Sequence, residues 1–297
     1  MLAANAGLLL TMLIWGAFIP VLALVLERWD PWTLTILRYL IALPLLALVI
    51  RVREGGPIVP AGLDWRRLWL FGGLGFGGFG GLYTLGVAHA HPVTAAVISA
   101  AAPTIALLFA WSVYGIKPGP GAGPALVLAF VGGLLAMVDW GASESSLQFQ
   151  GGEILLLAAA VCWSWYSIEA QRALPGLSQV RVTLVTMVPA ATVLFGAWLV
   201  AGLVGAANIP PPRPTAWDLL AFLYMGAAVA AMGVLLWNFG VRRLGIVVAS
   251  IYLNLIPVIS VLIAVALGYE ARWEQLVGGA LVLAGVAWSQ VRGRRHQ

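Results

Sequence analysis

Two prolines stand inside long apolar segments of this chain. Pro103 lies in AAVISAAAPTIA, and Pro257 lies in ASIYLNLIPVIS. Proline has no N–H and clashes with the carbonyl four residues earlier, which belongs to Ser99 or to Leu253. In apolar surroundings a carbonyl freed in this way must face protein or a wet cavity. Lining a cavity, the two carbonyls would be suitable acceptors for an ammonium group; the alternative is that each proline makes a packing kink.

Aromatic and polar side chains occupy the same deep parts of the apolar segments. Tyr and Trp have broad apolar faces and one polar tip, which suits a partly apolar guest. Trp163 and Tyr166 are three residues apart, so a helix places them on one face. The predicted binding residues are Trp15, Tyr83, Ser99, Pro103, Trp163, Tyr166, Trp237, Tyr252, Asn254 and Pro257. For any one of these residues, helix packing is the competing interpretation.

Arg38 is a charged residue inside the apolar segment 32–50. An ionisable residue within a membrane segment is a functional candidate by default. A long arginine can also extend its charge to the membrane interface. We expect Arg38 to anchor the helix, with Asp30 or Glu27 as a partner, and direct contact with a substrate is the alternative.

Composition places all these residues in a membrane. The chain has 62% hydrophobic and 9% charged residues, whereas soluble domains are about 25% charged. Barrel strands alternate apolar and polar residues over about 10 positions. This chain has unbroken apolar runs near the ~20 residues of a spanning helix instead. The first run lacks the flanks of a signal peptide, so we expect it to be retained. The single Cys162 excludes an internal disulfide.

Apolar runs between turn signals predict an all-α integral membrane fold of ten helices. The expected ranges are 5–26, 32–50, 67–88, 92–114, 122–140, 152–170, 180–202, 215–238, 246–267 and 273–291. In the third range, Gly73, Gly77 and Gly81 form a small-residue stripe that allows close helix approach. We interpret the stripe as helix packing.

The basic residues orient the helices. With the N-terminus in the cytoplasm, 12 of the 16 Lys and Arg residues lie on the cytoplasmic side and 3 lie outside. The positive-inside rule therefore predicts that both termini are cytoplasmic. This sidedness also accounts for the basic net charge, so nucleic acid is not an expected partner.

The chain also repeats itself. Residue pairs recur at an offset of 154: Asp64 and Asp218, Gly72 and Gly226, Gly86 and Gly240, Ala95 and Ala249, Pro103 and Pro257. Upstream, Trp15 matches Trp163 at an offset of 148. We expect two five-helix repeats, residues 1–142 and 143–297. Because five is odd, equivalent helices cross the membrane in opposite directions, which is the inverted repeat typical of transporters.

These features resemble the EamA-type branch of the drug/metabolite transporter superfamily. The resemblance rests on two five-helix halves with a proline in the fourth helix of each, on Trp15-Gly16, and on Arg38. Within this branch the chain is most similar to the YddG-type exporters of aromatic and neutral amino acids. Small multidrug exporters of the superfamily carry a glutamate in the first helix. The first helix here has none, so proton-coupled export of cationic drugs is not expected.

We therefore predict a secondary transporter that exports neutral or aromatic amino acids, or similar small amphipathic metabolites, across a bacterial-type inner membrane. Flux would be facilitative or weakly coupled. The expected partners are a small-molecule substrate and the lipid bilayer, with no cofactor and no metal; a monomer is the working assumption. The alternatives are export of another metabolite or drug class, a membrane-embedded lipid enzyme, and a scaffold. The enzyme would need an acid/base or metal cluster, and the sequence has no HExxH motif.

Overall fold

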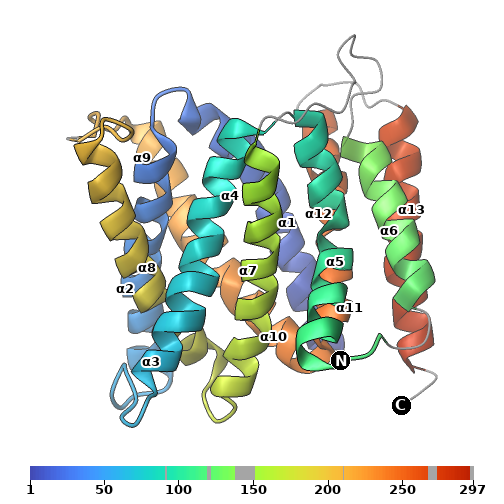
Figure 1. Cartoon of the computed structure of the whole chain (residues 1–297), viewed down its shortest axis with the longest axis horizontal. Helices are drawn as coiled ribbons and strands as arrows, with labels where there is room; N and C mark the ends of the chain where they lie inside the picture. Colours follow the sequence, from blue (N-terminus) through green and yellow to red (C-terminus); the bar gives the residue numbers. More distant parts are fainter. Residues whose placement is uncertain (91, 119–121, 138–150, 210, 267–272, 295–297) are drawn as a thin grey trace.

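The computed structural model describes residues 1–90, 92–118, 122–137, 151–209, 211–266 and 273–294. The described residues form helices and no strands, and the helices stand side by side as a bundle (Figure 1). The helices are α1 (Leu2–Leu26), α2 (Pro31–Arg53), α3 (Trp65–Leu68), η1 (Trp69–Gly77), α4 (Gly78–His89), α5 (Pro92–Tyr114), α6 (Ala122–Met137), α7 (Gly152–Ala173), α8 (Gln179–Leu203), α9 (Ala216–Leu223), η2 (Tyr224–Gly233), α10 (Val234–Leu244), α11 (Ile246–Tyr252), α12 (Leu255–Ala266) and α13 (Trp273–Arg294).

Each of the ten expected ranges contains a helix in the described part of the chain. Five continuous helical stretches are long and apolar enough to cross a membrane: Pro31–Arg53, Trp65–His89, Gly152–Ala173, Gln179–Leu203 and Ala216–Leu244. Shorter apolar helices accompany them, including parts of α1, α5, α6 and α13. The chain is therefore a multi-pass helical membrane protein.

The eighth expected range, 215–238, ends too early. Its helix continues to Leu244 and stops at Gly245, whose φ of +81° is a conformation that favours glycine. The sequence 238–244 includes Arg242 and Arg243, and a boundary drawn from apolar residues excluded them. The last turn of this helix is therefore charged, whereas the preceding turns are mostly apolar.

The ninth expected range, 246–267, is not one helix. It breaks between α11 and α12, and the Leu253 carbonyl accepts a hydrogen bond from the Ile256 N–H at 3.1 Å. Pro257 thus lies in the first turn of α12, where its missing N–H is not needed. The predicted free carbonyl at Leu253 is wrong. In the other half, by contrast, α5 runs as one helix through Pro103.

The repeat is visible in how the helices pack. η1 packs on α8 as η2 packs on α2, α4 packs on α7 as α10 packs on α1, and α5 packs on α7 as α12 packs on α1. In addition, η1 and η2 are both π-helical stretches in corresponding helices. Each of these features in one half therefore has an equivalent in the other half.

Single contacts repeat as well. A β-carbon at Gly72 would lie 2.8 Å from the Thr186 carbonyl oxygen, and one at Gly226 would lie 3.2 Å from the Arg38 carbonyl oxygen. The two glycines are 154 residues apart, and Arg38 and Thr186 are 148 apart. The offsets that relate residues in the sequence thus also relate contacts in space.

The glycine stripe of the third range packs against α8. The atoms nearest to a β-carbon at Gly77 would belong to the Ala190 backbone, at 3.1 Å, and a β-carbon at Gly81 would lie 3.6 Å from Leu194. A β-carbon at Gly73 would meet Val193 at 3.4 Å. Close helix packing, the interpretation made from the spacing, is confirmed.

Charged side chains form ion pairs between helix ends at the end of the bundle where Met1 lies (Figure 1). Arg181, at the start of α8, pairs with Glu54 at 2.6 Å. Arg67 pairs with Glu169 at 2.7 Å, and the Tyr114 hydroxyl donates to the same carboxylate at 2.8 Å. These contacts connect the two halves at this end.

Candidate functional site

Aromatic rings from both halves meet around Trp163, which lies on α7. Its ring centroid is 5.7 Å from that of Trp15 on α1 and 5.5 Å from that of Trp237 on α10. Phe79 on α4 is closer still, at 4.7 Å. These separations are those of favourable aromatic pairs. Trp163 is thus the centre of a cluster in the interior of the bundle.

The cluster continues through Tyr166, one helical turn beyond Trp163. Tyr166 stacks on Phe76 at 4.6 Å, and Phe76 contacts Tyr39 at 5.3 Å. On the other side, Phe79 contacts Tyr83 at 5.5 Å. We call these eight residues the aromatic cluster: Trp15, Tyr39, Phe76, Phe79, Tyr83, Trp163, Tyr166 and Trp237.

Hydrogen bonds hold three polar groups of the cluster. The Trp237 indole N–H donates to Ser167 Oγ at 2.9 Å, and the Trp15 indole N–H donates to the Val229 carbonyl at 3.2 Å. Asn238 Nδ2 donates to the Tyr166 hydroxyl at 2.8 Å. These bonds fix the orientations of the Trp15, Tyr166 and Trp237 rings, because their surroundings offer few other hydrogen-bond partners.

Part of the cluster is partly exposed. Trp237 and Tyr166 are fully buried, and Trp163 is 7% exposed. Trp15, Phe79 and Tyr83 are only partly buried. The buried rings form a rigid wall, and the partly exposed rings can contact a guest molecule.

Polar contacts beside the cluster follow the repeat. Thr35 and Thr84 hydroxyls lie 3.0 Å apart in the first half. At the equivalent positions of the second half, Asn238 Nδ2 donates to Thr183 Oγ1 at 3.1 Å. The offsets of 148 and 154 residues relate both members of the pair. The two halves therefore have similar polar contacts between equivalent helices, α2 with α4 and α8 with α10.

Arg38 lies over the Phe18 ring, with Cζ 5.2 Å from the ring centroid. The expected pairing with Asp30 or Glu27 is absent from the described residues. The Asp30 carboxylate instead accepts from the Thr33 and Asn208 backbone N–H groups. Asp30 caps α2, and this role uses the carboxylate that was expected to hold the arginine.

The structure brings together five of the ten predicted binding residues: Trp15, Tyr83, Trp163, Tyr166 and Trp237. Tyr252 is buried in the same hydrophobic core, and its hydroxyl donates to Asn5 Oδ1 at 2.9 Å. Asn254 is buried at the break between α11 and α12. Pro103 is buried within α5. The side chains of Ser99 and Pro257 lie outside the described residues.

Tyr39, Phe76 and Phe79 are cluster members that were not predicted. Phe76 and Phe79 stand in the glycine-rich stretch FGGLGFGGFGG. Where most neighbours have no side chain, large residues are the ones that reach an adjacent helix. That contrast in size was the available signal.

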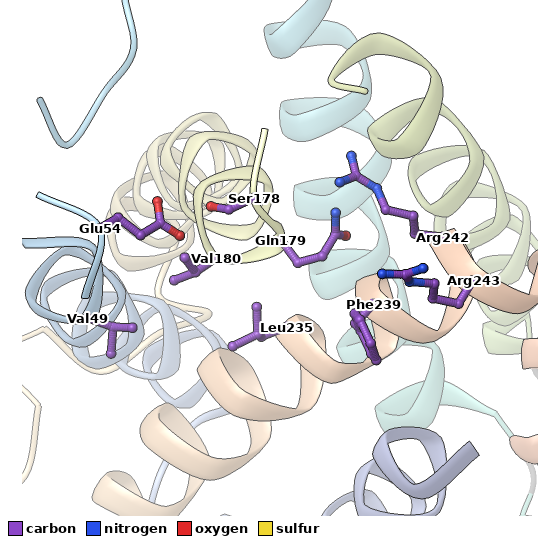
Figure 2. Close-up of a pocket in the computed structure, with 9 residues that line it drawn as sticks. All are labelled: Val49, Glu54, Ser178, Gln179, Val180, Leu235, Phe239, Arg242 and Arg243. Atoms are coloured by element: carbon purple, nitrogen blue, oxygen red, sulfur yellow. The ribbon is translucent and has the colours of Figure 1, made fainter. Parts of the chain in front are cut away.

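Two pockets open near Arg242, at the end of the bundle where Met1 lies. The first, of about 430 Å³, lies between α2, α8 and α10. Figure 2 shows the Gln179 side chain extending from the start of α8 toward Arg242 and Arg243. The second, of about 470 Å³, is lined by Arg172, Gln171 and Arg242 among others. None of the predicted binding residues lines either pocket. The described residues contain no group of three or more His, Cys, Asp or Glu side chains placed to hold a metal.

Asn238 offers a test of the wall of the cluster. We expect Asn238→Leu to destabilise the protein by about 1–3 kcal/mol, because Tyr166 and Thr183 lose a buried donor. Asn238→Thr should cost less, since threonine occupies the equivalent position, Thr84, in the other half. Thermal unfolding followed by size-exclusion chromatography measures the difference. Equal stability of Asn238→Leu and the wild type would contradict this role.

The chain is similar to several known proteins. The model of the EamA-like transporter family matches residues 2–138 and 150–290. A probable terminal-alkyne amino-acid exporter of Streptantibioticus cattleyicolor is 27% identical over 98% of this chain and 95% of its own length. The uncharacterized transporter YyaM of Bacillus subtilis is 28% identical over 73% of this chain and 70% of its own length. A solved crystal structure shares the fold, with a TM-score of 0.80 at 20% identity over 98% of both chains.

Proposed function

This chain belongs to the EamA-like transporter family, and we propose that it is a secondary exporter of neutral or aromatic amino acids or similar small amphipathic metabolites. The amino-acid exporter among its relatives supports this substrate class. We also propose that it is functionally close to the YddG-type exporters, and that it catalyses no chemical reaction.

The observation that carries the proposal is the aromatic cluster, with Trp163 at its centre. Rings from α1, α4, α7 and α10 meet there, so the cluster lies where the two halves join. A substrate side chain held by these rings would contact both halves at once. Relative movement of the halves would then change its access to one side of the membrane or the other.

The proposed topology has ten spans, with both termini in the cytoplasm of a bacterial-type cell. Residues 1–142 and 143–297 are the two inverted repeats, and the boundary between them lies outside the described residues. The exchange of packing partners between the halves supports this arrangement. Alternating access through the exchange of the two repeat conformations is the proposed mechanism.

The proposed binding residues are those in the cluster, Trp15, Tyr83, Trp163, Tyr166 and Trp237, together with Ser99, Pro103, Tyr252, Asn254 and Pro257. The last five would serve the region of α5, α11 and α12. Because the first helix has no acidic residue, we propose facilitative or weakly coupled flux.

Transport by the purified protein in liposomes tests the proposal. We expect labelled neutral amino acids such as L-phenylalanine to cross at least about 10-fold faster than in protein-free vesicles. A panel with basic and acidic amino acids, sugars and cationic dyes identifies any other substrate class. Flux no faster than in protein-free vesicles for every neutral amino acid would refute the substrate class. An imposed pH gradient then measures coupling.

A further inference from the structure

Arg38 is a charge placed inside a spanning helix. It lies seven residues after the start of α2, which is roughly 10 Å along the helix axis. A charge at such a depth is costly and is retained where it pairs or serves function. The question is therefore what Arg38 pairs with.

The described residues supply no anionic partner. Arg38 takes part in none of the ion pairs they form, and its buried Nε has no hydrogen-bond acceptor. Its contact with Phe18 is a cation–π contact at 5.2 Å. A guanidinium placed over a ring keeps its in-plane N–H groups available for an acceptor.

The fold does not require a charge at this position. Thr186 is the equivalent residue of the second half, at an offset of 148. It is fully buried, and its hydroxyl donates to the Val182 carbonyl at 2.8 Å. The helices around the two residues pack alike, with η2 on α2 and η1 on α8. Threonine therefore satisfies the packing at this position. Packing alone does not explain why the first half has a charged residue here.

Arg38 also adjoins the aromatic cluster. Tyr39, a cluster member, is its neighbour in the chain, and the Phe18 ring under the guanidinium lies one helical turn from Trp15 of the cluster on α1. The Trp15 ring in turn contacts the Trp163 ring, with 5.7 Å between their centroids. A molecule with an apolar side chain and a carboxylate could thus contact the rings with one part and the guanidinium with the other.

We propose that Arg38 binds the carboxylate of the transported substrate. The fork of guanidinium N–H groups matches two carboxylate oxygens, and such charge-assisted pairs are strong away from water. The substrate class is therefore narrowed to carboxylates with an apolar or aromatic side chain. This inference rests on the proposed function, whose substrate would supply the anion.

The test compares L-phenylalanine with L-phenylalaninamide, which keeps the ring and the ammonium group but lacks the carboxylate. Each compound competes with labelled L-phenylalanine for uptake into proteoliposomes. The proteins are the wild type, Arg38→Gln, Arg38→Lys and Arg38→Thr, the last of which places in α2 the residue found at the equivalent position of α8. The matched control is Arg51→Gln on the same helix, where the arginine is exposed.

We expect the wild type and Arg51→Gln to prefer L-phenylalanine over its amide by roughly 10- to 100-fold, the range of a charge-assisted hydrogen-bonded pair. Arg38→Gln and Arg38→Thr should lose this preference, and Arg38→Lys should keep part of it. A monodisperse size-exclusion profile confirms folding. If Arg38→Gln does not fold, Arg38→Thr and Arg38→Lys decide the matter.

Two results would overturn the inference alone. One is an unchanged preference in the Arg38 variants, and the other is a wild type that takes the amide as well as the amino acid. In both cases the protein still transports amino acids, so the proposed function stands. If the wild type transports no neutral amino acid, the proposed function fails and the role of Arg38 fails with it.

Discussion

Trp163→Ala should reduce the flux of neutral amino acids by roughly 100-fold, corresponding to about 3 kcal/mol of lost binding. Trp163 contacts the rings of Trp15, Phe76, Phe79, Tyr166 and Trp237. Removing the indole takes away apolar surface for the substrate and loosens the neighbouring rings. Initial rates of L-phenylalanine uptake into proteoliposomes, divided by the amount of reconstituted protein, measure the effect.

Two further variants separate transport from folding. Trp163→Phe keeps an aromatic face and should retain a larger part of the flux than Trp163→Ala. Trp111→Ala removes a tryptophan that is 54% exposed on α5, and it should transport as the wild type does. Wild-type flux in Trp163→Ala would show that the aromatic cluster serves packing alone. A scaffold role predicts instead that the wild type itself gives no flux above protein-free vesicles.

Gly152→Ala should have the largest effect on stability, a loss of about 3 kcal/mol or more. A β-carbon on Gly152 would clash with the Ala90 nitrogen and would lie 2.6 Å from the Gly86 carbonyl oxygen. These are backbone atoms of another helix and its end, so they cannot move aside as a flexible side chain can. We expect the contact between α4 and α7 to open, and the yield of monodisperse protein to fall.

Gly123→Ala is the matched control. Gly123 also lies near the start of a helix, α6, and a β-carbon there would meet no atom within 4 Å. Alanine at such a site lowers the entropy of the unfolded chain and can stabilise by about 0.4–1 kcal/mol. Fluorescence-detected size exclusion after stepwise heating compares the two variants. Equal melting profiles for Gly152→Ala and Gly123→Ala would refute the close approach of α4 and α7.

Much of the fold was predictable because membrane helices carry their signal locally. Apolar runs near 20 residues predicted a helix in every expected range of the described chain. The glycine stripe in the third range predicted close packing, and α8 provides it. Matched residues at offsets of 154 and 148 also predicted a repeat. The contacts of Gly72 with α8 and of Gly226 with α2 follow these offsets.

The candidate site was only partly predictable. Trp163 and Tyr166 were predicted from their spacing on one helix, and the repeat linked Trp163 to Trp15. Phe76 and Phe79 were missed, because their value depends on which helix faces them. Pro257 was interpreted as a helix break that frees a carbonyl, but the helix breaks at residues 253–254, before the proline, and the Leu253 carbonyl accepts from the Ile256 N–H.

The sequence alone determined that the protein lies in a membrane, that it is helical and that it contains a repeat, because each of these depends on composition or on spacing along the chain. Only the tertiary structure decided which rings meet around Trp163 and which carbonyls are satisfied. It also decided that Asp30 caps a helix while Arg38 lies over Phe18 without an anionic partner among the described residues. Such contacts depend on helix rotation and depth, which are set by packing between segments far apart in the chain.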